Sequence, residues 1–310
     1  MKFKSIIFIF LTLITIIYAI LIYQISLSTY TKTKPYIVCT TTIIHDTVKN
    51  ICKDTVELVA LMGPGIDPHL YKPVESDIFK IASADIIFYN GLHLEAKMGE
   101  LFEILAKHQT TVAVTQDIPT NLLLPVMGYQ TIYDPHVWFD ISLWMNAVET
   151  VYQALIVKIP EHADLYRQNK INYLQRLETA LQQSQQMMST IPIEKRVLIT
   201  AHDAFSYFGR LYGCKVVALQ GISTESSPGA YDVQEIIQLI YTQKIPAIFI
   251  ESSIPIKNIL AIQEGVAAYG YHVNLGGQLY SDALGCKGSQ GATYIDMIMH
   301  NMQTIVSALQ

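Results

Sequence analysis

Residues 160–190 read PEHADLYRQNKINYLQRLETALQQSQQMMST, a long polar run with no glycine and no proline after its first residue. Proline is tolerated at the first position of a helix, and Leu174, Leu177 and Leu181 recur at near-helical spacing. About 30 residues with a rise of about 1.5 Å each would span roughly 45 Å, longer than an ordinary domain helix. An amphipathic surface helix is one interpretation of this run. We favour a helix that connects two lobes.

Strand and helix patterns alternate on both sides of this run. Short runs rich in β-branched residues predict strands at Ile37–Thr42, Val56–Met62, Asp85–Tyr89, Thr111–Val114, Val197–Thr200, Lys215–Leu219, Ala247–Glu251 and Tyr271–Leu275. Helical patterns occur at Leu94–Lys107, Ser142–Lys158, Tyr231–Gln243, Lys257–Tyr269 and Thr293–Leu309. Such alternation indicates parallel sheets flanked by helices, and 310 residues exceed most single cores. We therefore predict an α/β protein with two similar lobes, each with a mostly parallel sheet, joined by one long helix.

The N-terminal segment differs from the rest of the chain. Lys2 and Lys4 precede an almost uninterrupted apolar run from Ile6 to Ile25, and Ser26-Leu27-Ser28 offers small residues for cleavage. A secretory core has about 7–15 apolar residues and a membrane span about 20, so both a cleaved signal peptide and an uncleaved anchor remain open. A buried core helix is a third alternative. Both main alternatives export the rest of the chain, to the periplasm or the outer face of the cytoplasmic membrane.

The predicted organisation follows from these boundaries: 1–28 signal peptide or N-terminal membrane anchor, 29–35 linker, 36–159 N-terminal lobe, 160–190 connecting helix and 191–310 C-terminal lobe. Charged residues make up 15% of the chain and the formal net charge is -5, so no basic surface for nucleic acid is indicated. The first cysteine, Cys39, lies inside a predicted strand, which gives no support to a lipid-modified cysteine after the apolar run. We interpret the four cysteines mainly as small buried residues, with Cys214–Cys286 the favoured pair if a disulfide forms.

Two turns share the sequence Asp-Pro-His, at Asp67–His69 and Asp134–His136. Proline fixes one of its own backbone angles and restricts the residue before it, so each histidine is presented from a stiff turn. His69, His202 and Asp282 each come after a predicted strand, and open α/β sheets bind ligands beyond the carboxyl ends of their strands. His136 has no confident strand before it.

Three histidines and one aspartate are a ligand set suited to zinc, and the carboxylate leaves manganese open. Each member also has an ordinary interpretation, because a single loop histidine is commonly just a hydrogen-bonded polar residue and Asp282 could cap a helix. The nearby acids Asp67, Asp134 and Asp203 could orient the imidazoles. The histidines outside these motifs, including His93, are not candidates.

The chain closely resembles the TroA-like metal receptors of zinc and manganese ABC transporters, from about Pro35 to Gln310. The segments that carry the resemblance are GPGIDPHLY, YNGLHLEAKMGE, DPHVWFD, TAHDAFSYFGRLYG, IFIESSIPIKN and LYSDALG. The resemblance implies two α/β lobes joined by one long helix, with the metal in the cleft between them. It also implies ligands at His69 and His136 in the N-terminal lobe and at His202 and Asp282 in the C-terminal lobe.

Family differences at the third ligand bear on the metal. Manganese-dedicated members often have glutamate there, whereas zinc and dual-metal members have histidine, as His202 is here. Zinc-dedicated members often add a histidine-rich loop, and Thr120–Tyr133 contains no histidine. The resemblance therefore implies the dual-metal branch, with Zn2+ or Mn2+ as cargo, Fe2+ also open, and no catalytic cofactor.

The implied function is an exported, monomeric receptor that delivers its metal to an ABC permease with a cytoplasmic ATPase. A metal-binding surface adhesin and a zinc hydrolase are the alternatives. The hydrolase is disfavoured because catalytic zinc keeps an open position for water and neither HExxH nor GxSxG occurs.

Overall fold

The computed structural model describes residues 13–20, 34–126 and 132–310, and it divides into two compact units, Met1–Pro35 and Tyr36–Gln310. In the first unit, residues 13–20 are helical and exposed. The remainder of the predicted signal peptide or anchor lies outside the described residues. No helix among the described residues is both long enough and apolar enough to cross a membrane.

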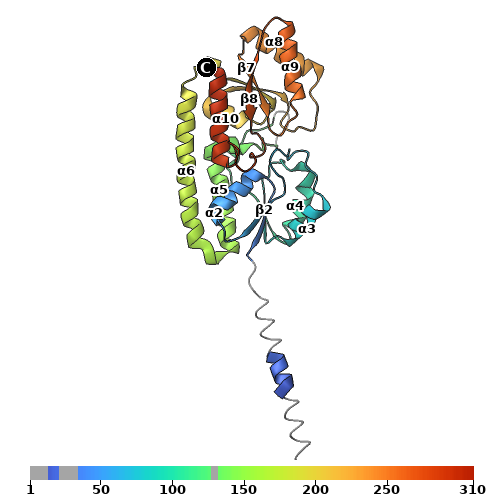
Figure 1. Cartoon of the computed structure of the whole chain (residues 1–310), viewed down its shortest axis with the longest axis vertical. Coiled ribbons are helices and arrows are strands. Elements are labelled where there is room, and N and C mark those ends of the chain that lie inside the picture. The colour runs from blue at the N-terminus through green and yellow to red at the C-terminus, as the bar shows by residue number, and fades with distance from the viewer. Residues whose placement is uncertain (1–12, 21–33, 127–131) are drawn as a thin grey trace, which may run out of the picture. The chain divides into compact units, whose positions relative to one another are not determined.

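The N-terminal lobe contains a parallel sheet with strand order β2-β1-β3-β4. Its strands are β1 (Tyr36–Cys39), β2 (Glu57–Ala60), β3 (Ile86–Tyr89) and β4 (Thr110–Ala113). Side chains alternate between the two faces: Ile37 of β1 joins a core with α2 (Thr42–Cys52), and Val38 joins a core with α3 (Glu75–Ser83) and α4 (Gly99–Leu105). Figure 1 accordingly shows α2 on one side of the strands and α3 and α4 on the other.

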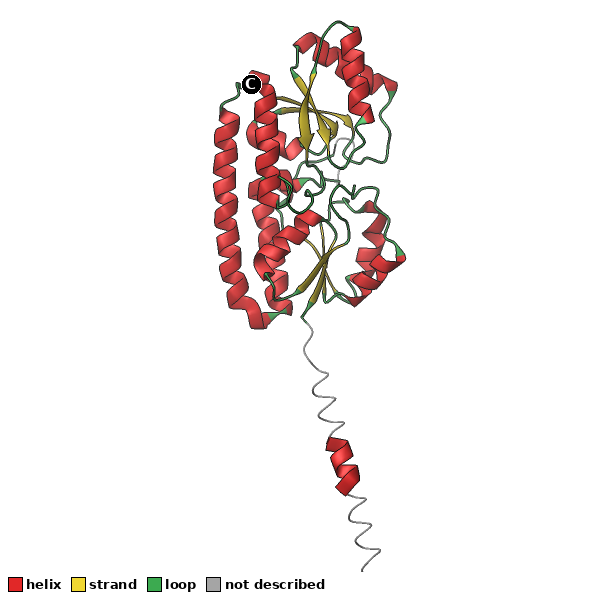
Figure 2. Cartoon of the chain, in the orientation of Figure 1, coloured by secondary structure: helices red, strands yellow, loops and turns green. Residues whose placement is uncertain are grey.

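One long helix runs along both lobes, with a second helix beside it at the N-terminal lobe and a third beside it at the C-terminal lobe, as Figures 1 and 2 show. In that order they are α6 (Ala163–Ser189), α5 (Ile141–Lys158) and α10 (Tyr294–Leu309). Helix α6 has 27 residues and buries Tyr166, Tyr173 and Leu177 against neighbours that include α2 and α5 of the N-terminal lobe and α10 of the C-terminal lobe. The predicted long helix is therefore present, although Pro160 begins a short 3-10 turn and the α-helix starts three residues later.

The C-terminal lobe contains two pairs of parallel strands, with β5 beside β7. Its strands are β5 (Val197–His202), β6 (Lys215–Gln220), β7 (Ala247–Glu251) and β8 (Asn274–Leu279). Besides α10, its helices are α7 (Ser206–Tyr212), α8 (Ala230–Gln243) and α9 (Lys257–Ala268). The structure also contains short 3-10 turns, at η1 (Ala96–Met98), η2 (Thr120–Leu122), η3 (Val137–Phe139), η4 (Pro160–His162) and η5 (Ile193–Lys195). The predicted fold class, two α/β lobes with parallel strands joined by one long helix, is confirmed.

The last strand lies further along the chain than predicted. The sequence indicated Tyr271–Leu275, whereas β8 begins at Asn274 and runs through Gly276 and Gly277 to Leu279. A Cβ at Gly276 would lie 2.6 Å from a ring carbon of Phe249 and 2.9 Å from the Cβ of Ala308. The glycine therefore permits close packing of β8 against β7 and α10. It does not end the strand.

The cysteines form no disulfide among themselves. Cys39 and Cys52 are buried, Cys214 is partly buried and Cys286 is exposed. The interpretation as small buried residues holds for the first two, and the pairing of the last two is not formed.

Candidate metal centre

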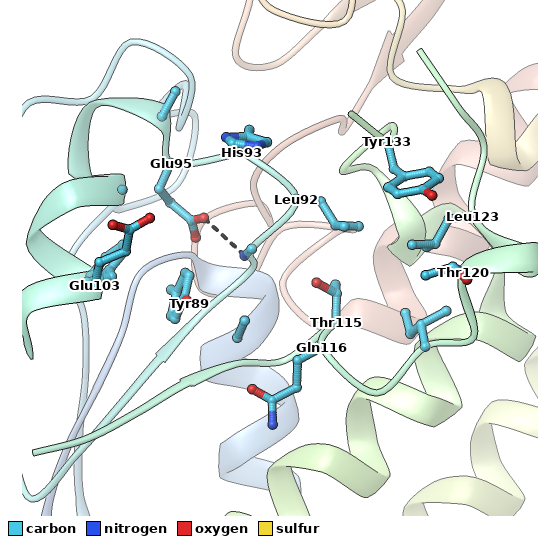
Figure 3. A pocket seen from close by; sticks show the side chains of 16 residues that line it. Tyr89, Leu92, His93, Glu95, Glu103, Thr115, Gln116, Thr120, Leu123 and Tyr133 are labelled. Atoms are coloured by element: carbon cyan, nitrogen blue, oxygen red, sulfur yellow. Dashed lines mark hydrogen bonds between the residues drawn. The ribbon is translucent and has the colours of Figure 1, made fainter. Parts of the chain in front are cut away.

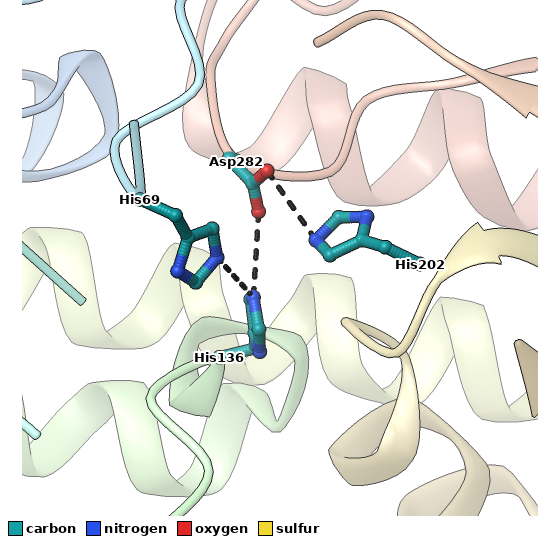
Figure 4. A group of neighbouring side chains, drawn as sticks. All are labelled: His69, His136, His202 and Asp282. Carbon is teal, nitrogen blue, oxygen red and sulfur yellow. Dashed lines mark hydrogen bonds and ion pairs between the residues drawn. The ribbon is translucent and has the colours of Figure 1, made fainter. Parts of the chain in front are cut away.

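The structure brings the four candidate ligands, His69, His136, His202 and Asp282, into one cluster (Figure 4). Each offers one nitrogen or oxygen, and these atoms all lie within 4.8 Å of one another. All four side chains are buried, with exposed fractions of 3% or less. Four convergent donors that exclude water in this way are suited to holding a single cation.

His69 is held by the turn that precedes it. Asp67 Oδ1 accepts a hydrogen bond of 2.9 Å from the His69 backbone N–H, while its Oδ2 accepts one of 2.5 Å from the hydroxyl of Thr224. His69 Nε2 then lies 3.2 Å from His136 Nε2. The carboxylate of Asp67 therefore fixes the backbone of His69 and leaves the imidazole ring free to face the cluster.

His136 follows the same turn sequence, but its aspartate does more. Asp134 Oδ1 accepts from the His136 backbone N–H at 2.9 Å and lies 2.7 Å from its Nδ1. A hydrogen bond from Nδ1–H to this carboxylate leaves Nε2 facing the other candidate ligands. That Nε2 lies 3.5 Å from Asp282 Oδ1.

His202, the last residue of β5, is fixed by Glu251, the last residue of the adjacent strand β7. Glu251 Oε2 lies 2.6 Å from His202 Nδ1, and Oε1 accepts from the backbone N–H groups of Ala201 and His202 at 2.8 and 2.9 Å. Sequence reasoning missed Glu251. Its signal was an acidic residue at the end of an otherwise apolar strand.

Asp282 comes three residues after β8 and completes the cluster. Its Oδ2 accepts from Ser253 Oγ at 3.1 Å and lies 3.4 Å from His202 Nε2. Neither Asp282 Oδ1 nor His202 Nε2 has a hydrogen-bond partner, although both atoms are buried. Buried polar atoms are rarely left unpaired, and a cation between these two atoms would satisfy both.

Charges within the cluster follow from burial and from its neighbours. Burial, opposed by Asp282 and reinforced by the other histidines, lowers the pKa of His69 to about 3. Burial also opposes the charge of His202, but Glu251 and Asp282 outweigh it and hold its pKa well above the usual value. Burial disfavours the Asp282 carboxylate, but the histidines hold its pKa below the usual value. At neutral pH the centre thus has a neutral His69, an ionised Asp282, and a proton on His202 that a cation would replace.

The predicted supporting acids have different roles. Asp134 orients an imidazole as expected, and Asp67 binds the backbone instead. Asp203 accepts from Ser206 Oγ at 2.7 Å, and no described hydrogen bond joins it to a candidate ligand.

Two cavities near the candidate site share His93 in their linings. One, of about 690 Å³, is lined by residues of both lobes, among them His69, His93 and Asp203. The second, of about 430 Å³, is seen in Figure 3 and is lined by Glu95 and none of the four candidate ligands. His93 lines both. It therefore stands beside the centre without belonging to it.

Known proteins resemble this chain over nearly the whole of its second unit. The sequence profile of the family described as ZnuA, "Zinc-uptake complex component A periplasmic", matches residues 37–308. The chain is 46% identical over 276 residues to the zinc-binding protein TroA of Treponema pallidum (strain Nichols), which covers 89% of each chain. It is 44% identical over 274 residues to the manganese-binding lipoprotein MntA of Bacillus subtilis (strain 168), covering 88% of this chain and 89% of that protein.

A solved structure gives the same result. The periplasmic zinc-binding protein TroA from Treponema pallidum superposes with a TM-score of 0.87 at 46% identity, covering 89% of this chain and 99% of that one. The two-lobed fold and all four candidate ligands fall within the matched region.

Proposed function

The chain belongs to the ZnuA family of periplasmic zinc-uptake components, and we propose that it captures one divalent transition metal with His69, His136, His202 and Asp282 and delivers it to a membrane permease. The observation that carries this proposal is the buried cluster, with four donor atoms within 4.8 Å of one another. Two of the donors lack any other partner, which supports a cation as the natural occupant.

The same ligand set supports capture over catalysis. Catalytic zinc usually has three protein ligands and a water, whereas four protein ligands leave no position for a reacting water. We therefore propose that the protein is a receptor and not an enzyme, and that it binds its cargo without a catalytic cofactor.

Zinc and manganese are both proposed as cargo. Three imidazoles favour zinc, and divalent affinities generally place zinc above manganese. The relatives support both, since TroA is described as zinc-binding and MntA as manganese-binding. Loading in the cell then depends on which metal is available.

Family membership also supports a cellular setting. Relatives include periplasmic proteins and lipoproteins described as substrate-binding components of metal ABC transporters, so the protein is exported. We propose that residues 1–28 act as a signal peptide or anchor and 29–35 as a linker, with lobes at 36–159 and 191–310 joined by 160–190. A permease with its ATPase is the proposed partner of a monomeric receptor.

A competition titration tests the function. Purified protein should bind one zinc or manganese ion per chain with a dissociation constant well below about 1 μM. Asp282→Asn should lose most of this affinity, and Asp164→Asn, which alters an exposed carboxylate, should not. Absence of binding tighter than about micromolar for both metals would sink the proposal.

A further inference from the structure

Three of the four proposed ligands, His136, His202 and Asp282, are braced: they lie beside buried hydrogen bonds that join the two lobes. Buried hydrogen bonds connect the two lobes directly beside them: Trp138 Nε1 to the Ser281 carbonyl (3.0 Å), the Tyr207 hydroxyl to the Asp134 carbonyl (3.0 Å) and the Tyr294 hydroxyl to the Trp138 carbonyl (2.7 Å). These bonds tie the turn of His136 to the segment that follows His202 and to the segments on both sides of Asp282. The relative positions of these three ligands therefore depend on several buried contacts at once.

His69 is held differently. It lies on the loop between β2 and α3, and among the described residues one hydrogen bond joins this loop to the C-terminal lobe, from Thr224 Oγ1 to Asp67 Oδ2. The other oxygen of the same carboxylate accepts from the His69 backbone N–H. Through Asp67, the position of His69 is thus coupled directly to Thr224.

Thr224 belongs to residues 221–226 of the C-terminal lobe, which follow β6 and which we call the latch. A second contact crosses the cleft here, an ion pair between Glu225 and Lys97 of η1. Lys97 and Glu225 are 38% and 44% exposed, so water and salt reach this pair.

Residues of the latch line two different cavities. On one side, Ser223 lines the cavity of about 690 Å³ together with His69. On the other, Thr224 lines a cavity of about 470 Å³ together with Asp67 and Leu70. Between these cavities, the hydrogen bond from Thr224 to Asp67 and the ion pair of Glu225 with Lys97 are the polar contacts that the latch makes to the N-terminal lobe among the described residues.

We propose that residues 221–226 form a releasable latch that sets the rate at which the metal leaves: Thr224–Asp67 holds His69 against the other three ligands, and Glu225–Lys97 holds the latch against the N-terminal lobe. This inference rests on the proposed function. His69 is the first ligand to detach, because among the described residues a single hydrogen bond, Thr224–Asp67, joins its loop to the C-terminal lobe while the braced ligands stay together. Helix α6, which runs along both lobes, need not move when His69 detaches.

Zinc dissociation from the full chain tests the latch. Zinc-loaded protein is mixed with an excess of the chromogenic chelator 4-(2-pyridylazo)resorcinol, and the first-order release rate is measured at saturating chelator. Thr224→Val should raise the dissociation rate about tenfold, as expected for loss of one hydrogen bond to a charged group, with the association rate changed far less. Thr224→Ser keeps the hydroxyl and should restore the slow rate.

Two variants serve as matched controls. Thr242→Val removes a hydroxyl that bonds only within α8, and Glu149→Gln breaks a lysine pair whose glutamate is 45% exposed, close to the 44% of Glu225. Glu225→Gln should speed release about two- to fivefold at low salt, and this difference should vanish near 1 M salt. Both controls should remain within twofold of the unaltered protein.

A release rate for folded Thr224→Val within twofold of the unaltered protein would overturn the latch. If that variant does not fold, Glu225→Gln decides: a release rate equal to that of Glu149→Gln at low salt overturns the proposal. These results are distinct from failure of the proposed function, which would appear as absence of tight metal binding by the unaltered chain.

Discussion

Glu251 and His202 end two adjacent parallel strands, and the carboxylate of the first fixes both the ring and the backbone of the second. The two contacts to His202 measure 2.6 Å at Nδ1 and 2.9 Å at the backbone N–H. The ring is thereby held in the tautomer that presents Nε2 to the other proposed ligands.

Replacement of this carboxylate should weaken metal binding without removing a ligand. Glu251→Gln keeps the shape of the side chain but loses the charge that supports the imidazole, and we expect zinc affinity to fall about 10- to 100-fold. Competition titration measures the change. Glu264→Gln, an exposed site on α9, is the control and should bind as tightly as the unaltered chain. Equal affinities for the two variants would contradict this role of Glu251.

Metal binding should release a proton near neutral pH. The carboxylates around buried His202 hold its pKa well above the usual value, so a cation must displace the proton there. Affinity should therefore decrease as the pH falls from about 7.5 to 5.5, by up to tenfold per pH unit for each proton displaced. Calorimetric titration in buffers with different ionisation heats counts the released protons. A buffer-independent binding heat would refute the prediction.

Stability of the metal-free fold should also depend on Asp46, which lies on α2. Burial, the largest influence, raises the pKa of Asp46 to about 6 in the folded protein, from 3.8. Because the folded value is the higher one, this group stabilises the fold below about pH 4, and the contribution is lost as the pH rises through about 6. Asp46→Asn should therefore gain stability relative to the unaltered chain between pH 4 and 7, by at most about 3 kcal/mol.

Urea unfolding at several pH values measures this difference, with Asp164→Asn as an exposed control. The free energy of unfolding, taken relative to that of the unaltered chain, should rise with pH for Asp46→Asn and should not change with pH for the control. A stability difference independent of pH would show that burial of Asp46 has no such effect.

The glycine in β8 should be sensitive to a single added methyl group. Gly276→Ala introduces a Cβ that meets the Phe249 ring and Ala308 at 2.6–2.9 Å, so we expect a loss of about 1–3 kcal/mol in the free energy of unfolding. At Gly99 the same substitution meets no atom within 4 Å. Denaturant melts of the two variants test the difference, and equal stabilities would argue against close packing at β8.

Much of the fold was accessible from the sequence because its signals are local. The long glycine-free run predicted α6, the strand Ala247–Glu251 matches β7 at both ends, and the resemblance to TroA-like receptors is confirmed by the family match. The paired Asp-Pro-His turns likewise pointed to His69 and His136 from neighbouring residues alone.

Other features depend on contacts between distant parts of the chain. Glu251 supports His202 across 49 positions of sequence, and no local pattern reveals that their strands lie side by side. The same limit explains the misplaced last strand, which was predicted to stop at Leu275: the local sequence does not show that the ring of Phe249 packs against Gly276. Thr224, 157 positions from Asp67, is a third case.

Helix α6 limits the ways in which a permease can distinguish the metal-loaded receptor from the empty one. Helix α6 has 27 residues and packs against helices of both lobes, so we expect the two lobes to move little relative to each other when the metal leaves. Empty and loaded receptors would then have nearly the same radius of gyration and nearly superimposable small-angle scattering curves. A permease that prefers the loaded form must accordingly recognise differences the size of a side chain at the mouth of the cleft. The binding energy of docking can then act at the cleft, because none of it is needed to move the two lobes.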